Sequence, residues 1–219
     1  MPDVAAPSAP QLPAQLQLYD QVGSLDHDAV LAEVELTGVR LSAQNARGVS
    51  VASSVLASVE LSDSRLEQLR LTDVRLTGCD LANVRAPRAS ALRVLADGCR
   101  LTGAALVDAL VRDVTIKDSR VDLASFSASR LQRVTFDACL LAGSDFVETQ
   151  LDSVRFHDCD LRSADFTGAR MQRCELRRCD LAGIRGADGL RGSRMEWADI
   201  VAMAGTWAGA LGIGVIEED

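Results

Sequence analysis

The most regular feature of the chain is an apolar residue at every fifth position from Leu36 to Leu181. These positions hold Leu, Ile, Val, Phe, Met or Ala, and all five Phe residues of the chain lie among them. Two residues before each of them lies a second series, made of Val, Ala, Ser, Cys or Thr, from which only Gln44 and Leu69 depart. A repeat of this length determines the architecture before any single motif does.

The five-residue period excludes an ordinary helix or strand. A helix repeats every 3.6 residues and a strand every two, so neither keeps this register over some 150 residues. A coil with flat faces of five residues does, if two side chains of each face point inward and three outward. Four faces make a square turn of about 20 residues, and stacked turns pair like strands at roughly 4.8 Å. The narrow interior admits one medium and one small side chain per face, which accounts for an aromatic content of only 4%.

The repeat resembles the pentapeptide-repeat family, whose consensus is A(D/N)LXX. Copies of the consensus occur at residues 79–83 (CDLAN), 159–163 (CDLRS), 164–168 (ADFTG) and 179–183 (CDLAG). The resemblance covers about 31 consecutive pentapeptides, or about 70% of the chain. It implies an all-β solenoid, a right-handed quadrilateral β-helix of about eight coils and on the order of 37 Å in length. The coil centred on Ala86, Ala91 and Ala96 is expected to be the least well packed.

The limits of the repeat divide the chain into four segments. Residues 1–14 contain four of the five prolines and are predicted to be a disordered tail. Residues 15–33 are predicted to cap the open N-terminal end of the solenoid, because an exposed end would pair with other strands. The β-helix is assigned to residues 34–190, and a C-terminal helix with a tail to residues 191–219.

The C-terminal segment contains a candidate dimerisation surface. A helix from Trp197 to Leu211 would gather on one stripe the side chains of Trp197, Ile200, Val201, Ala204, Trp207, Ala208 and Leu211. Residues 200–216 are uncharged, but this stretch is rich in Ala and Gly and has no basic flank, so we predict a buried helix and no membrane span. Because the stripe is too apolar for a free surface, either the last coil or a second subunit must cover it, and we expect a homodimer through this end.

The six cysteines invite a metal or disulfide interpretation, but their positions favour a structural one. Every cysteine lies in the series of small residues, where Cys acts as a small buried hydrophobe. There is no CxxC motif and no His at ligand spacing, since His27 and His157 are the only two. We therefore predict no metal and no cofactor, and reduced thiols that fit a cytoplasmic location. The first 30 residues lack Lys, Arg and the apolar stretch of a secretory signal.

The sequence offers no candidate for catalysis. It has no glycine-rich phosphate loop, nucleophile elbow or HExxH motif. His157 lies at an outward position beside Asp158, but with no third member and no cleft we interpret it as a solvated side chain. A catalytic site is therefore not predicted, and the outer surface is the place to look for function.

Charge is unevenly distributed over that surface. The net charge of the chain is −8, yet residues 31–190 hold 22 acidic and 21 basic side chains, so most of the excess is terminal. The acidic balance argues against direct binding to nucleic acid or to anionic membranes. Within residues 140–190, two adjacent faces carry six acidic side chains against Arg162 and Arg185, and we call these six residues the acidic edge: Asp145, Glu148, Asp160, Asp165, Asp180 and Asp188.

Two functional hypotheses follow. Some members of the family imitate duplex DNA and occupy the DNA-binding groove of a type II topoisomerase, so the resemblance implies a DNA-mimicking modulator of DNA gyrase or topoisomerase IV that protects against topoisomerase poisons. The acidic edge would be its partner-binding surface. The alternative is a generic pentapeptide-repeat scaffold with an unknown protein partner, for which solvated Asp and Arg ladders serve only solubility.

Overall fold

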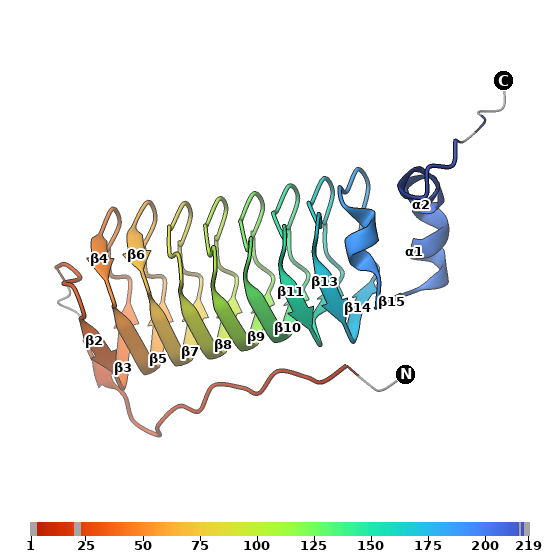
Figure 1. Ribbon diagram of the computed structural model, residues 1–219. Helices are drawn as coiled ribbons and strands as arrows, with labels where there is room; N and C mark the ends of the chain where they lie inside the picture. The colour runs from red at the N-terminus through yellow and green to blue at the C-terminus, as the bar shows by residue number, and fades with distance from the viewer. Residues whose placement is uncertain (1–3, 20–22, 215, 217–219) are drawn as a thin grey trace.

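A computed structural model describes residues 4–19, 23–214 and 216, and in it the chain winds into a right-handed quadrilateral β-helix (Figure 1). The main sheet joins neighbouring turns in parallel, with a register of 20 residues, so that Val74 pairs with Val94 and Val94 with Val114. Five residues per face and four faces per turn therefore stack each residue on its equivalent one turn away. The predicted fold class is confirmed.

The strands are of two lengths. Those that span two faces and the corner between them are β5 (Ser50–Ala57), β7 (Arg70–Thr77), β8 (Ser90–Asp97), β9 (Leu110–Lys117) and β10 (Arg130–Asp137). The shorter strands are β1 (Gln17–Leu18), β2 (Val30–Ala32), β3 (Val34–Thr37), β4 (Asn45–Arg47), β6 (Arg65–Glu67), β11 (Gln150–Asp152), β12 (Arg155–His157), β13 (Arg170–Gln172), β14 (Cys174–Arg177) and β15 (Ser193–Met195). The remaining two faces of most turns are linked by single bridges, such as Asp80 to Arg100.

A left-handed backbone conformation marks every corner of the coil. Positive φ recurs at each fifth residue from Asp28 to Gly183, and 24 of these corner residues are not glycine. At four corners per turn this makes eight regular turns, followed by an irregular ninth that contains a 3-10 helix, η1 (Ala187–Leu190). The regular coil thus begins before residue 34. Residues 26–33 form part of its first turn rather than the predicted cap, because Leu31 points inward in the five-residue register and β2 pairs with β5.

Phenylalanine rings fill the C-terminal half of the tube. Phe126, Phe146 and Phe166 stack at centroid distances of 5.2 and 5.1 Å, because residues 20 apart lie one above the other. Phe136 and Phe156 form a second stack at 5.1 Å, and the rings of the two stacks meet edge to face. Offset stacked and edge-to-face pairs are the arrangements that aromatic rings prefer.

The small-residue series packs beside the rings and uses its polar atoms internally. The Ser129 hydroxyl donates to the carbonyl of Leu106 and accepts the N–H of Ala109. Cysteines take the same place, and five of the six are buried, whereas Cys179 is half-buried in the last regular turn. Burial raises the pKa of the Cys174 thiol to about 11, so this thiol stays protonated and unreactive at neutral pH.

The turn predicted to be poorly packed encloses a cavity. Where most turns carry larger apolar side chains, this one has Ala86, Ala91 and Ala96, and about 90 Å3 of empty space remains among apolar side chains. The hydrogen-bonded ladders on either side hold the backbone at its ordinary spacing, so the walls cannot collapse into the gap. This turn is the weak point of the core.

Filling the cavity should stabilise the protein. Ala91→Val adds two buried carbon atoms at a β-strand position and is expected to raise the free energy of unfolding by about 1 kcal/mol. Urea unfolding followed by circular dichroism measures the change. The matched control is Ala124→Val in the fully packed region, where Ala124 is completely buried and overpacking should cost about 1–3 kcal/mol. Equal loss of stability in both variants would contradict the cavity assignment.

The C-terminal segment differs from the single helix that we predicted. Helix α1 (Trp197–Ala202) ends at Met203, and helix α2 (Ala204–Ala210) begins directly after it. Met203 has φ −94° and ψ 5° and is buried, so the break turns its side chain onto the core of the solenoid. Neither helix, within the described residues, is long and apolar enough to span a membrane.

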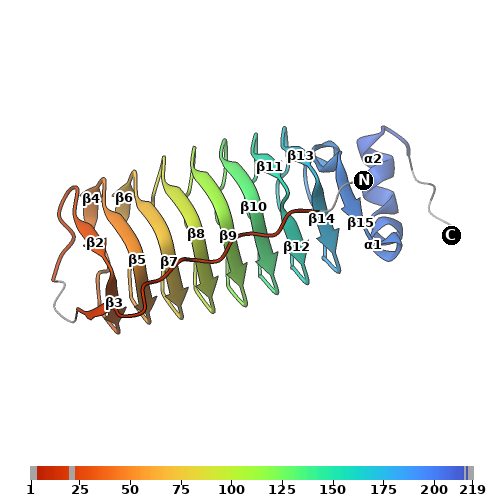
Figure 2. The same cartoon turned by 90° about the horizontal axis from the view of Figure 1, so that it is seen from below.

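The N-terminal residues also differ from the prediction. Residues 4–16, which we call the strap, run along the outside of the solenoid toward its N-terminal end, crossing β12, β10, β9, β8 and β7 (Figure 2). Residues 4–14 of the predicted disordered tail are therefore ordered against the coil, and residues 1–3 lie outside the described part. The strap then enters β1, which pairs with β3.

Candidate interaction surfaces

The structure brings four residues of the acidic edge together around one corner of the coil, whereas Glu148 lies at the next corner and Asp188 in η1. Asp145 and Asp165 are paired one turn apart, as are Asp160 and Asp180. They flank the corner formed by Gly143, Ser163 and Gly183, which lies diagonally across the square coil from the corner under the strap. The two surfaces are therefore on opposite sides of the rod.

Four of the six acidic side chains have a local structural role. The carboxylates of Asp145, Asp160, Asp165 and Asp180 each accept the backbone N–H two residues further on, at 2.8–3.1 Å. This Asx turn shapes the chain at the start of a face. The Asp of the repeat consensus is thus required for the turn as well as for surface charge.

Two arginines offset part of the negative charge. Arg162 forms a bidentate ion pair with Asp160 at 2.9 and 2.7 Å and approaches Asp180 at 3.6 Å. Arg185 lies 3.0 Å from Asp165. The Arg162 guanidinium holds the pKa of the Asp160 carboxyl below its usual range. Glu148, Asp180 and Asp188 are exposed, whereas Asp145, Asp160 and Asp165 are half-buried.

The residues of the predicted dimerisation stripe do not all face the same way: some pack against the solenoid and others face solvent. Trp207 is half-buried against the core, whereas Trp197 and Leu211 are 76% and 75% exposed. Val201 and Ala204 are also exposed. An open groove of about 520 Å3 lies between the helices and the last turn, with Ile200, Trp207 and Leu211 among its lining residues. The helices thus cover the end of the solenoid incompletely.

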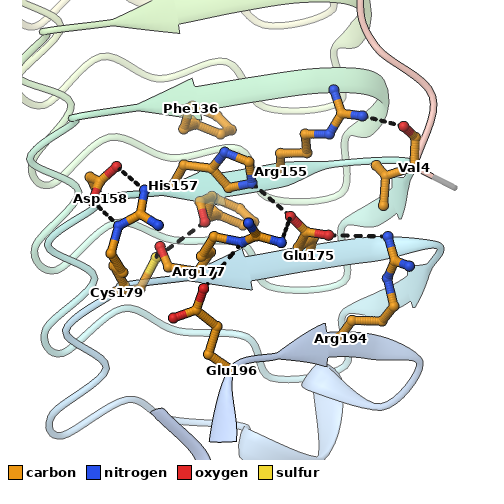
Figure 3. Close-up of polar contacts among 12 residues, drawn as sticks. Val4, Phe136, Arg155, His157, Asp158, Glu175, Arg177, Cys179, Arg194 and Glu196 are labelled. Atoms are coloured by element: carbon orange, nitrogen blue, oxygen red, sulfur yellow. Dashed lines mark hydrogen bonds and ion pairs between the residues drawn. The ribbon is translucent and has the colours of Figure 1, made fainter. Parts of the chain in front are cut away.

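Glu175 is the centre of a polar cluster at the C-terminal end of the coil (Figure 3). Its carboxylate lies 3.0 Å from His157 Nε2, and Arg177 and Arg194 approach it at 3.2 and 3.1 Å. Asp158 is paired with Arg178 instead of His157. His157 is therefore hydrogen-bonded to Glu175 rather than solvated as predicted, and Asp158 is not its partner.

The corner under the strap carries an alternating series of charges that sequence reasoning missed. We call this the strap corner; its residues are Ser53, Asp73, Arg93, Asp113, Arg133, Ser153 and Arg173. Arg93 donates two hydrogen bonds to Asp73 at 2.6 Å, and Arg133 donates two to Asp113 at 2.7 Å. Both carboxylates are buried, with 7% and 4% of their surface exposed.

The strap completes the hydrogen bonding of these two carboxylates. The backbone N–H of Gln11 donates to Asp73 at 2.9 Å, and that of Ser8 donates to Asp113 at 3.2 Å. Near its start, Arg155 donates to the carbonyl of Val4 (Figure 3). The sequence contains two signals for this arrangement, Asp and Arg alternating at 20-residue spacing and prolines three residues apart. Neither signal shows that the proline-containing segment lies on the Asp and Arg residues.

Among residues 4–19, 23–214 and 216, no group of three His, Cys, Asp or Glu side chains is placed to hold a metal ion. The surfaces that remain are the acidic edge, the C-terminal end and the strap corner.

The comparisons with known proteins agree with the repeat. The family model described as a pentapeptide repeat region matches residues 69–146 and 120–185, which together span more than half of the chain. Similar solved structures include HetL, involved in heterocyst differentiation regulation in the cyanobacterium Nostoc sp. strain PCC 7120, at 17% identity, with 77% of this chain and 90% of that chain covered and a TM-score of 0.34.

Another is QnrB1, a plasmid-mediated fluoroquinolone resistance protein, at 16% identity, with 93% of this chain and 100% of that chain covered and a TM-score of 0.40. No curated protein matches the sequence. With its unbroken five-residue register and the family match over most of the coil, the chain belongs to the pentapeptide-repeat family.

Proposed function

We propose that the protein is a non-catalytic, cytoplasmic binding protein whose acidic edge imitates duplex DNA toward DNA gyrase or topoisomerase IV. The observation that carries the proposal is the position of the edge. Four of its six carboxylates, those of Asp145, Asp160, Asp165 and Asp180, flank one corner of the last turns, diagonally across the coil from the strap. A rigid rod with this edge open to solvent can enter a groove that accepts DNA.

Charge density sets the demand on such a mimic. Duplex DNA carries one phosphate charge per roughly 1.7 Å of its axis, whereas equivalent carboxylates on the coil are about 4.8 Å apart. Gathering acids on two faces around one corner narrows this difference. The ion pairs of Arg162 and Arg185 reduce the net negative charge of the acidic edge. They therefore favour the second candidate, a generic scaffold for an unidentified protein partner.

The test separates charge from turn structure. Asp145→Asn, Asp165→Asn and Asp180→Asn together keep an oxygen acceptor for each Asx turn but remove three charges, so the fold should remain intact. We expect wild-type protein to alter gyrase supercoiling and quinolone-stabilised cleavage, and the triple variant to lose at least tenfold in apparent affinity. Affinity should also fall steeply with salt.

The matched control is Asp80→Asn. Asp80 makes the same Asx turn, to Ala82, but lies in the N-terminal half of the coil outside the acidic edge. If the control weakens the effect as much as the triple variant, the acidic edge is not the contact surface. If wild-type protein leaves supercoiling and cleavage unchanged at several micromolar, the topoisomerase proposal fails and the scaffold remains.

We further propose that two copies of the chain associate through their C-terminal ends. Trp197 and Val201 are exposed on α1, and an open groove lies between the helices and the last turn. A two-fold contact would cover this surface on both copies.

Trp197→Glu is expected to convert the dimer into monomers in sedimentation velocity, because it places a charge in the contact. Trp207 faces its own core, so Trp207→Glu would test the cap instead. Wild-type protein that sediments as a monomer at micromolar concentration would contradict the dimer.

A further inference from the structure

The strap contacts the solenoid with a period of three residues. Along it, the residues that turn toward the coil are buried or half-buried at every third position, namely Val4, Pro7, Pro10, Pro13 and Leu16. The positions between them are exposed, with Leu12 the one exception. A polyproline II helix has three residues per turn, and prolines at this spacing favour that conformation. The burial pattern of the strap is thus that of a polyproline II helix with one ridge against the coil.

The spacing of the solenoid matches this helix. Ser8 and Gln11 are three residues apart, which corresponds to about 9.3 Å along a polyproline II helix at 3.1 Å per residue. Their acceptors, Asp113 and Asp73, are two turns apart, or about 9.6 Å at the ordinary strand spacing. One helical turn of the strap therefore advances by two turns of the coil. Both donors are the N–H groups directly after a proline.

The acceptors are held ready for such a ligand. The guanidinium groups of Arg93 and Arg133 fix each carboxylate by two hydrogen bonds and leave it facing the strap. The outward residues beside the strap corner include Val55, Leu92 and Leu95, which are half-buried. These apolar side chains lie beside the two buried acceptors, so a proline-rich segment on this corner gains both packing and backbone hydrogen bonds.

Recognition through the strap corner is largely independent of the side chains between the prolines. The two hydrogen bonds use backbone N–H groups, and Ser8, Ala9 and Gln11 are exposed. Any segment with the pattern Pro-x-x-Pro-x-x-Pro, where x retains its N–H, presents the same ridge and the same donors. The strap is thus one member of a class of ligands that the surface accepts.

We propose that the strap corner is a binding track for proline-rich segments of another protein, selected by a proline at every third residue, and that the chain's own strap occupies the track until such a segment displaces it. The strap is tethered, so its effective concentration reaches the millimolar range. A segment of another protein must compete with the strap. Its apparent affinity is the intrinsic affinity multiplied by the fraction of molecules in which the strap has left the track. This inference is independent of the acidic edge, because the two surfaces are on opposite corners.

The experiment weakens the binding of the chain's own strap to the strap corner without removing residues. In the full chain, Pro7→Gly, Pro10→Gly and Pro13→Gly together abolish the polyproline II preference of the strap. The probe is a fluorescent peptide with the sequence of residues 4–16, and the control peptide has the same composition with its prolines four residues apart. Fluorescence anisotropy should show the probe binding at least tenfold more tightly to the triple-glycine variant than to wild type, and at least tenfold more tightly than the control peptide.

A second variant ties the binding to the acceptors. Adding Asp73→Ala and Asp113→Ala to the triple-glycine chain should reduce probe affinity at least tenfold, while adding Asp118→Ala, at an exposed corner residue elsewhere on the same turn, should not. Failure of the triple-glycine variant to bind the probe, or equal binding of both peptides, overturns the proposal. If the probe dissociates wild-type dimers into monomers, the track is occupied by the strap of a second copy. That result would also overturn the proposal. Supercoiling by gyrase is not a readout here, so either proposal can fail without the other.

Discussion

Replacing Phe146 with alanine should lower the free energy of unfolding by about 3–5 kcal/mol. Phe146 is completely buried and stacks between Phe126 and Phe166, with Phe136 and Phe156 packed edge-on against it. Removing the ring leaves a cavity whose walls are fixed by hydrogen-bonded ladders, so little of the lost packing is recovered. Denaturant unfolding monitored by circular dichroism measures the change.

The control for this prediction is Phe146→Leu, which restores the most common residue of the central series. It is expected to cost less than half as much, because leucine keeps most of the buried apolar surface. A loss below about 1 kcal/mol for Phe146→Ala would mean that the coil can close around the gap. In that case the cavity near Ala91 would also need another explanation.

Replacing Asp113 with alanine should be the most damaging single change at the strap corner. It removes two hydrogen bonds from Arg133 and one from the Ser8 N–H. Losing a hydrogen bond to a charged group costs about 1.5–3 kcal/mol, and the partly exposed Arg133 regains hydrogen bonds to water. We expect a destabilisation of about 2–3 kcal/mol, together with loss of protection of the Ser8 amide in hydrogen exchange. The proline-bearing ridge of the strap should detach at the same time.

The control is Asp118→Ala. Asp118 also has a positive φ, of 49°, but it is exposed and lies at a different corner from the strap. Both variants place alanine in a left-handed conformation, so the backbone strain is the same in each. The difference between their free energies of unfolding therefore measures the contribution of the ion pair and the strap. If the two variants unfold at the same denaturant concentration with the Ser8 amide still protected, the strap is held by its prolines alone.

Acid should release the strap in the same way. The Arg133 guanidinium holds the pKa of the Asp113 carboxyl below its ordinary value of 3.8, and Arg93 does the same for Asp73. Because both values are lower in the folded state, their contribution to stability is complete above the unfolded-state value. It is lost as pH falls below 3.8 and through the lower folded-state values. Protection of the Ser8 and Gln11 amides should therefore weaken as pH falls below 3.8 and be lost below the folded-state pKa values of the two carboxyls, ahead of the buried ladder.

The position of the strap corner has a functional consequence for the molecule. The acidic edge and the strap corner lie across the coil from each other, and each uses residues that stack at 20-residue spacing. A partner on one side does not cover the other. The solenoid can therefore hold a topoisomerase and a proline-rich segment at once, if both proposals are correct.

The five-residue period was sufficient to predict the coil, its interior and its weakest turn. Each inward side chain depends only on its equivalents one turn away, so the pattern along the chain already specifies the packing around Phe146 and the gap around Ala91. The same regularity placed the acidic side chains on two adjacent faces. It did not show that Asp145, Asp165 and Asp180 are needed for Asx turns or that Arg162 and Arg185 neutralise part of the edge, because those contacts depend on side-chain conformation.

The segments outside the repeat were decided only by tertiary structure. Their residues have no neighbours at a fixed sequence spacing, so local composition predicts a disordered tail and one continuous helix. The strap is ordered because buried Asp73 and Asp113, more than 60 residues away in sequence, accept its N–H groups. The C-terminal helix breaks at Met203 because the end of the core accepts that side chain. Sequence determined what repeats every fifth residue in this protein, and long-range contact determined the conformation of everything that does not repeat.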